Sequence, residues 1–172
     1  MAGRRVPAAQ SAAEASRTAP PRVDWARSSQ LAQAIAAGYG ADVCWEAAIV
    51  ALLLLGRPTG ARYVEGFLIP PDTDLPDDAL PIAHGWAELA DGTILDPHQA
   101  AIRGALRGRP EPSYLAVRRY PLEDVLSAHQ RRARFPLMYH GRAEPDDPEV
   151  LAVRAEALRL TLAARAAWRR RA

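Results

Sequence analysis

The chain has 172 residues, of which 49% are hydrophobic and 24% charged, and its 22 basic and 20 acidic side chains give a net charge of +2. This length and hydrophobic content are enough for one domain with its own core. The near balance of charge, with arginines spread along the chain, argues against a nucleic-acid-binding protein. A single cysteine excludes an internal disulfide, so nothing in the sequence requires an oxidising compartment.

The first segment, residues 1–22, is rich in Ala, Ser, Pro and Arg and has almost no large apolar side chain. Such a segment cannot bury enough surface to offset the entropy cost of ordering it, and it lacks the apolar stretch of a signal peptide. We therefore expect a disordered tail, then a single domain over residues 23–172, in a cytoplasmic protein. The apolar run 47–55 is about half as long as a membrane span needs, so we interpret it as a buried helix.

Two helices are expected at the start of the domain. The first covers residues 28–37, with Ser28 or Ser29 as its N-cap. The second covers residues 43–55, and Asp42 is its expected N-cap.

Cys44 falls in the first turn of the second helix, where unpaired backbone N–H groups and the helix dipole favour an anion. A thiol in such a position ionises more readily than a free one. An isolated Cys beside an apolar helix is more often a small buried filler. The presence of His84 and Asp96 later in the sequence favours a nucleophile, because a thiol, an imidazole and a carboxylate are the parts of a cysteine acyl-transfer site.

Strands are expected over residues 61–69, 82–89 and 93–96, where side chains alternate between two faces. Glu65 is a charge on a mainly apolar face of the first strand, and it either faces the site or lies at a sheet edge. The link PPDTDLPDDALP before the second strand is rich in Pro and Asp, which predicts a surface loop at the rim of a cleft.

The second and third strands form a hairpin, and its loop decides whether His84 and Asp96 can meet. Opposed residues of an antiparallel pair have positions of constant sum and share a face. A two-residue turn would put these two side chains on opposite faces, whereas a loop of residues 90–92 puts them diagonally on the same face. We therefore predict an odd-length loop or a compensating bulge, with Gly92 at positive φ.

Further along the chain, SYLAVRRY predicts another strand, and PLEDVLSAHQRRA predicts a short helix with Pro121 in its first turn. Asp146, Asp147 and Pro148 then begin a helix that runs to Arg171. Apolar residues recur along it at three- and four-residue spacing: Val150, Val153, Ala157, Leu160, Ala164 and Trp168. That stripe either packs on the domain or pairs with a protein partner.

The motifs CWEAA, ARYVEGF, HGWAEL and ILDP, in this order between Cys44 and Pro97, resemble the core of transglutaminase-like (papain-like) cysteine enzymes. In that family a Cys opens a buried helix, and the His and Asp lie on successive strands. The resemblance covers roughly the middle third of the chain. It implies an α+β, papain-like fold in which a Cys-bearing helix packs on a small antiparallel sheet. Gly85 and His98 depart from the pattern, because family members often have an Ala and a Thr there.

The resemblance also implies a catalytic triad of Cys44, His84 and Asp96. The expected function is cysteine-dependent acyl transfer or hydrolysis on an amide of a peptide or protein, as in a peptidase, deamidase or transglutaminase. Nothing in the sequence chooses between water and an amine as the second substrate. Two alternatives remain, namely a peptide-processing enzyme of the same fold that depends on a partner, and a non-catalytic binding module that keeps the fold.

Candidate substrate-binding residues surround the triad. The backbone N–H of Cys44 or Trp45 is the first candidate for the oxyanion donor, and the side chains of Gln33 and Tyr39 are weaker ones. Trp86, two residues after the histidine, either shields the imidazole, forms a wall of the cleft or belongs to the core.

No cofactor is expected. His84 and His98 with Asp96 suggest a metal site, but their spacing matches no zinc pattern, and Cys44 would have to be recruited as well. We therefore expect no metal.

Overall fold

A computed structural model of the chain describes residues 22–39, 43–70, 80–103, 111–139, 142 and 144–171. The expected tail, except its last residue, and most of the expected Pro- and Asp-rich loop lie outside these residues. The elements in chain order are α1 (Trp25–Gly38), α2 (Cys44–Leu54), β1 (Arg62–Ile69), β2 (Ile82–Glu88), β3 (Ile94–Leu95), α3 (Pro97–Arg103), β4 (Ser113–Pro121), α4 (Leu122–Gln130), a 3-10 turn η3 (Leu137–Tyr139) and α5 (Pro148–Arg169).

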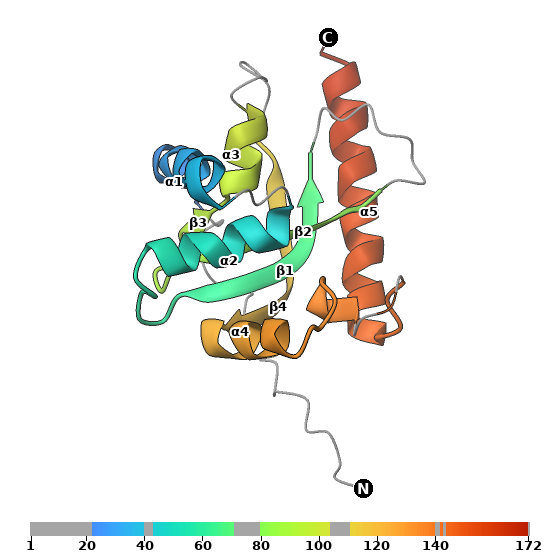
Figure 1. Cartoon of the computed structure of the whole chain (residues 1–172). Helices are drawn as coiled ribbons and strands as arrows, with labels where there is room; N and C mark the ends of the chain where they lie inside the picture. The colour runs from blue at the N-terminus through green and yellow to red at the C-terminus, as the bar shows by residue number, and fades with distance from the viewer. Residues whose placement is uncertain are drawn as a thin grey trace, which may run out of the picture.

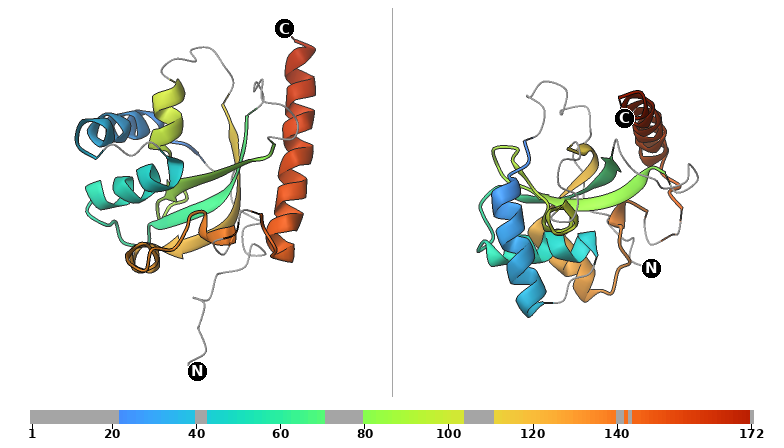
Figure 2. Two further views of the ribbon diagram at one scale, coloured as in Figure 1. Left: turned by 45° about the vertical axis from the view of Figure 1, so that its right-hand side comes forward. Right: turned by 90° about the horizontal axis from the view of Figure 1, so that it is seen from above.

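The strands form one antiparallel sheet of four, in the order β3-β2-β1-β4. Helices α1, α2 and α3 lie together on one side of the molecule, and α5 lies beside the sheet on the other (Figure 1, Figure 2). This arrangement confirms the expected α+β class and the expected strands, although β3 is shorter than predicted. Helix α3 was not expected, since the sequence after Asp96 carries no clear helix signal.

β1 bends near its middle, which lets it pack against two different helices (Figure 1). Its register with β4 shifts between Glu65 and Gly66, as a β-bulge does. A Cβ on Gly66 would lie 2.1 Å from the carbonyl oxygen of Leu115, so only glycine fits this close approach of two backbones. Before the bend, Tyr63 packs in the cluster that includes α2; after it, Phe67 packs in the cluster that includes α5.

α1 begins three residues earlier than predicted, and its N-cap is Asp24, whose side chain accepts a hydrogen bond of 3.0 Å from the Arg27 N–H. The predicted cap at Ser28 or Ser29 is therefore wrong. Ser28 lies inside the helix, fully buried, and its hydroxyl donates to the Asp24 carbonyl oxygen at 2.6 Å. A serine that bonds back to the preceding turn fits a helix interior as well as a cap.

α2 begins at Cys44, as predicted within one residue, but its N-cap is Val43 and not Asp42. Asp42 itself lies outside the described residues. Val43 has an extended backbone, and its apolar side chain cannot accept a hydrogen bond, so it makes no side-chain cap. The buried side of α2 is built of small and branched apolar residues: Ala47, Ala48, Ile49, Ala51 and Leu52.

α5 follows the prediction closely, with Asp147 as its N-cap and Pro148 in its first turn. The first half of the predicted stripe packs on the domain, where Val150 and Ala157 are buried with Phe67. Towards the C-terminus Trp168 is 37% exposed. Pairing of this helix with a partner stays a prediction. No helix in the described residues combines the length and the apolar character needed to cross a membrane.

Candidate functional site

The hairpin between β2 and β3 has the predicted loop of three residues. Ala87 pairs with Leu95 and Glu88 with Ile94, a constant sum that also puts Leu89 opposite Thr93. The Leu89 N–H donates to the Thr93 carbonyl oxygen at 2.9 Å, which closes the loop. Gly92 has φ of 83°, in the left-handed region where glycine costs least. The predicted register is therefore confirmed.

This register brings His84 and Asp96 into direct contact. Nε2 of His84 and Oδ2 of Asp96 lie 2.6 Å apart, and the two side chains are only 2% and 1% exposed. A pair this short and this buried is a charge-assisted hydrogen bond with little competition from water.

The two groups hold each other in their charged forms. Burial alone would lower the pKa of His84, but the charge of Asp96, the hydrogen bond to Asp96 and the neighbouring Cys44 side chain raise it to about 10. Burial likewise opposes ionisation of Asp96, yet the His84 charge and the hydrogen bonds it accepts lower its pKa below the ordinary value. At neutral pH the pair is an imidazolium and a carboxylate.

Cys44 lies beside the imidazole of His84. Its side chain is close enough to His84 for its charge and hydrogen bonding to contribute to the raised pKa of that ring. Because Asp96 occupies Nε2, the ring nitrogen left for the thiol is Nδ1. Cys44 is the first residue of α2 and is 8% exposed. The sulfur therefore lies at a helix start beside a protonated imidazole.

Asp96 is positioned by three further segments of the chain. Its backbone N–H donates to the Ser28 hydroxyl of α1 at 3.0 Å. Its Oδ1 accepts from the Gln99 N–H of α3 at 2.9 Å, and its Oδ2 accepts from the Tyr114 hydroxyl of β4 at 2.8 Å. Neither Ser28 nor Tyr114 was expected in the site, because contacts 68 and 18 residues apart leave no local pattern in the sequence.

Aromatic rings enclose the imidazole of His84. The centroids of the Trp86, His98 and Tyr114 rings lie 6.3, 5.9 and 6.2 Å from its own. Trp86 is 1% exposed and belongs to the core, so it backs the imidazole and does not form a wall of a cleft. His98 is half-buried on α3, and burial followed by the charge of His84 lowers its pKa. A cationic and a neutral imidazole therefore lie side by side.

Gly85 explains how α2 comes so close to β2. A Cβ built there would lie 3.1 Å from Cε3 and 3.3 Å from Cα of Trp45, and 3.1 Å from the Tyr63 hydroxyl. Trp45 follows Cys44 directly, so any side chain at Gly85 pushes on the start of the helix that carries the thiol. The glycine at position 85 thus has a local steric reason.

We expect Gly85→Ala to slow alkylation of Cys44 by roughly 3- to 10-fold, because a shift of a few tenths of an ångström weakens a geometry-dependent contact with His84. The measurement is the iodoacetamide rate at pH 6 with circular dichroism as a check of folding. Gly38→Ala is the matched control, since a Cβ there meets nothing within 4 Å. Equal rates for Gly85→Ala and wild type would show that the position of α2 does not set the reactivity.

The weaker oxyanion candidates are not supported by their positions. Gln33 is exposed on α1, and Tyr39, just after α1, is 61% exposed. Trp45 is half-buried and packs against Gly85 and the α2 cluster. The backbone N–H groups of Cys44 and Trp45 remain the better candidates, because they lie in the first helical turn and Val43 provides no side-chain cap.

Glu65 is neither at a sheet edge nor exposed, since β1 is a central strand and its carboxylate is fully buried. It accepts hydrogen bonds from the Tyr63 hydroxyl at 2.8 Å and from the N–H groups of Leu137 and Met138 at 2.8 and 2.6 Å. Burial raises its pKa to about 7 against the effect of these donors. Its hydrogen bonds fix η3 on the sheet next to Tyr63.

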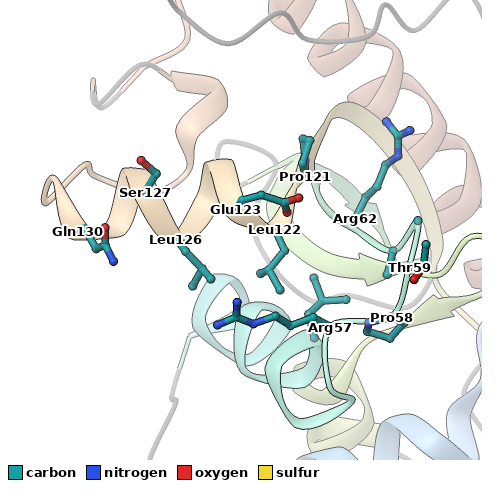
Figure 3. A pocket seen from close by; sticks show the side chains of 13 residues that line it. Arg57, Pro58, Thr59, Arg62, Pro121, Leu122, Glu123, Leu126, Ser127 and Gln130 are labelled. Atoms are coloured by element: carbon teal, nitrogen blue, oxygen red, sulfur yellow. The ribbon is translucent and has the colours of Figure 1, made fainter.

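Within the described residues, no group of three or more His, Cys, Asp or Glu side chains is arranged to hold a metal ion. A pocket of about 720 Å³ opens at the far end of α2 (Figure 3). Leu52, Arg57, Arg62 and Glu123 are among its lining residues. Leu52 follows Cys44 by eight residues, about 12 Å at the usual helical rise. The pocket therefore lies apart from the three predicted catalytic residues.

We compared the chain with protein-family models, with curated proteins and with solved structures, and none of the three matches it.

Proposed function

We propose that this protein is a cysteine-dependent acyltransferase or hydrolase with a transglutaminase-like (papain-like) site, in which Cys44 is the nucleophile, His84 the acid and base, and Asp96 the residue that orients His84. The observation that carries the proposal is the buried His84 and Asp96 pair at 2.6 Å, with the only thiol of the chain at a helix start beside it. A cysteine that only fills space in the core would not require a buried ion pair beside it.

In the first half of the reaction, Nδ1 of His84 holds the proton of the Cys44 thiol. The thiolate attacks the carbonyl carbon of an amide or ester, a C–S bond forms, and the carbonyl π electrons move to the oxygen. Backbone N–H groups at the start of α2 stabilise this oxyanion. When the tetrahedral intermediate collapses, the C–N or C–O bond breaks, and the leaving group takes the proton from His84.

The second half runs through the same atoms. His84, now neutral, takes a proton from water or from an amine, which attacks the thioester carbon. Collapse breaks the C–S bond and returns the thiolate beside a protonated His84. Water yields a carboxylic acid, and an amine yields a new amide, so the identity of the second substrate decides between hydrolysis and transamidation. Throughout both halves Asp96 keeps the proton of Nε2 in place and supports the imidazolium.

A small activated ester tests this proposal without knowledge of the natural substrate, and small size suits a thiol that is only 8% exposed. We expect p-nitrophenyl acetate to release nitrophenolate in a burst and to leave one acetyl group on Cys44, detected by intact-mass and peptide mass spectrometry. His84→Ala should slow the acylation by roughly 10²- to 10⁴-fold, the usual contribution of a general base.

Cys44→Ser and Cys44→Ala are the controls for the site of modification, and both should lose the acetyl adduct. His129→Ala is the matched histidine control, because it removes an imidazole from α4, on which no step depends. If folded wild-type protein shows no burst and no adduct, the result would contradict the proposed enzymatic function and support a non-catalytic binding module that retains the fold. A burst that His84→Ala leaves intact would remove His84 from the reaction.

A further inference from the structure

The Asp96 carboxylate shares one oxygen between two donors from different strands. Oδ2 accepts from His84 Nε2 at 2.6 Å and also from the Tyr114 hydroxyl at 2.8 Å, whereas Oδ1 accepts from the Gln99 N–H at 2.9 Å. Because Asp96 is 1% exposed, these donors take the place of water around its charge. Tyr114 is therefore the second donor to the oxygen that bonds His84.

Tyr114 reaches this oxygen by a fixed route. It lies on β4, where it pairs with Leu68 of β1, so its side chain passes over β1 to the strands that carry the pair. Its ring packs edge to face on Trp86, with centroids 5.2 Å apart, and lies 6.2 Å from the ring of His84. A ring held by Trp86 keeps the hydroxyl aimed at Asp96.

A second donor to one carboxylate oxygen changes the strength of the hydrogen bond between that oxygen and the first donor. The Tyr114 hydrogen bond disperses negative charge from Oδ2 and is one of the contributions that lower the pKa of Asp96, after burial, which opposes it, and the stronger contribution of His84. A less basic oxygen forms a weaker bond to the Nε2 proton. It also stabilises the imidazolium less, so His84 yields its other proton to a leaving group more readily.

We propose that Tyr114 is a positioning residue that sets the strength of the bond between His84 and Asp96 by sharing the carboxylate oxygen with it. The consequence for catalysis rests on the function proposed above, but the effect on the bond itself does not. Among the residues that the structure describes, the other titratable groups that face the pair are Cys44 from α2 and His98 from α3. The test must therefore keep both of them unchanged.

The first measurement needs no substrate. In the ¹H and ¹⁵N NMR spectra of the resting protein, the Nε2 proton of His84 should move downfield in Tyr114→Phe, because Oδ2 of Asp96 then accepts a hydrogen bond from His84 alone. The midpoint at which His84 loses its charge should rise by about 0.5 to 1 pH unit. Tyr120→Phe is the control, since Tyr120 lies on the same strand but contacts the Tyr63 ring, with centroids 6.1 Å apart.

A second variant, with a smaller change at position 114, keeps the proposal testable if Tyr114→Phe does not fold. Replacement of Tyr114 by 3-fluorotyrosine keeps the ring and makes the hydroxyl a stronger donor, so the same resonance should move upfield. Opposite shifts in the two variants support the proposal. If the resonance is unchanged in both variants and their thermal midpoints equal that of wild type, the proposal is overturned, and Tyr114 contributes to packing only. If the resonances shift as expected but Cys44 is never acylated, the proposed function fails and the role of Tyr114 in the pair stands.

Discussion

Asp96→Ala should lower the free energy of unfolding by about 3 to 5 kcal/mol, the cost of removing one partner of a buried ion pair. His84 is 2% exposed, so without Asp96 its positive charge loses its carboxylate partner and finds little water in its place. For a domain of this size the loss corresponds to a fall in the thermal midpoint of roughly 10 °C. Thermal and urea unfolding followed by circular dichroism give both quantities.

The size of this loss should depend on pH in a defined direction. The pKa of His84 is raised from 6.5 to about 10, so its pairing stabilises the fold fully below about pH 6.5 and loses this effect as the pH rises through 10. The pKa of Asp96 is lowered from 3.8, so its contribution is lost as the pH falls below that value. The difference between wild type and Asp96→Ala should thus be largest between about pH 4 and 6.5 and shrink towards pH 10.

Two controls separate the charge from the shape of the side chain. Asp96→Asn keeps the size of the side chain and an acceptor for the Gln99 N–H, and should cost less than Asp96→Ala. In the double variant Asp96→Ala with His84→Leu neither charge of the pair remains, so stability should partly return. If Asp96→Ala were as stable as wild type at pH 6, the pair would not carry the charges assigned to it.

The sequence predicts the part of the site that depends on local rules. Because side chains alternate along a strand, only an odd-length loop or a bulge puts His84 and Asp96 on one face, and Gly92 suits the third position of a loop of residues 90–92. Cys44 falls at a helix start because an apolar run follows it directly. These are short-range patterns, and the structure agrees with each of them within one or two residues.

The sequence does not predict the groups that hold the site from a distance. The sequence predicts Ser28 as a possible helix cap, whereas its hydroxyl accepts a hydrogen bond from the Asp96 N–H. Tyr114 on β4 and the partners of Glu65 in η3 meet their targets only when the sheet order β3-β2-β1-β4 is known. The steric role of Gly85 is hidden for the same reason, because it depends on how closely α2 approaches β2.

The reactivity of Cys44 is the second large effect expected from this geometry. Iodoacetamide alkylates the thiolate form of a cysteine, and the charged imidazole of His84 lies beside the Cys44 side chain. His84→Ala removes the cation from this arrangement. Asp96→Asn keeps the imidazole but removes the carboxylate that supports its charge, so its effect should be smaller than that of His84→Ala.

The most direct test of the triad is therefore the rate at which iodoacetamide alkylates Cys44 at pH 6, measured by mass spectrometry against free cysteine under the same conditions. The geometry predicts that Cys44 reacts much faster than free cysteine although it is only 8% exposed, that His84→Ala abolishes most of this excess, and that Asp96→Asn abolishes less. A Cys44 that reacts no faster than free cysteine, at a rate that neither substitution changes, would contradict the assignment of Cys44, His84 and Asp96 as a catalytic triad.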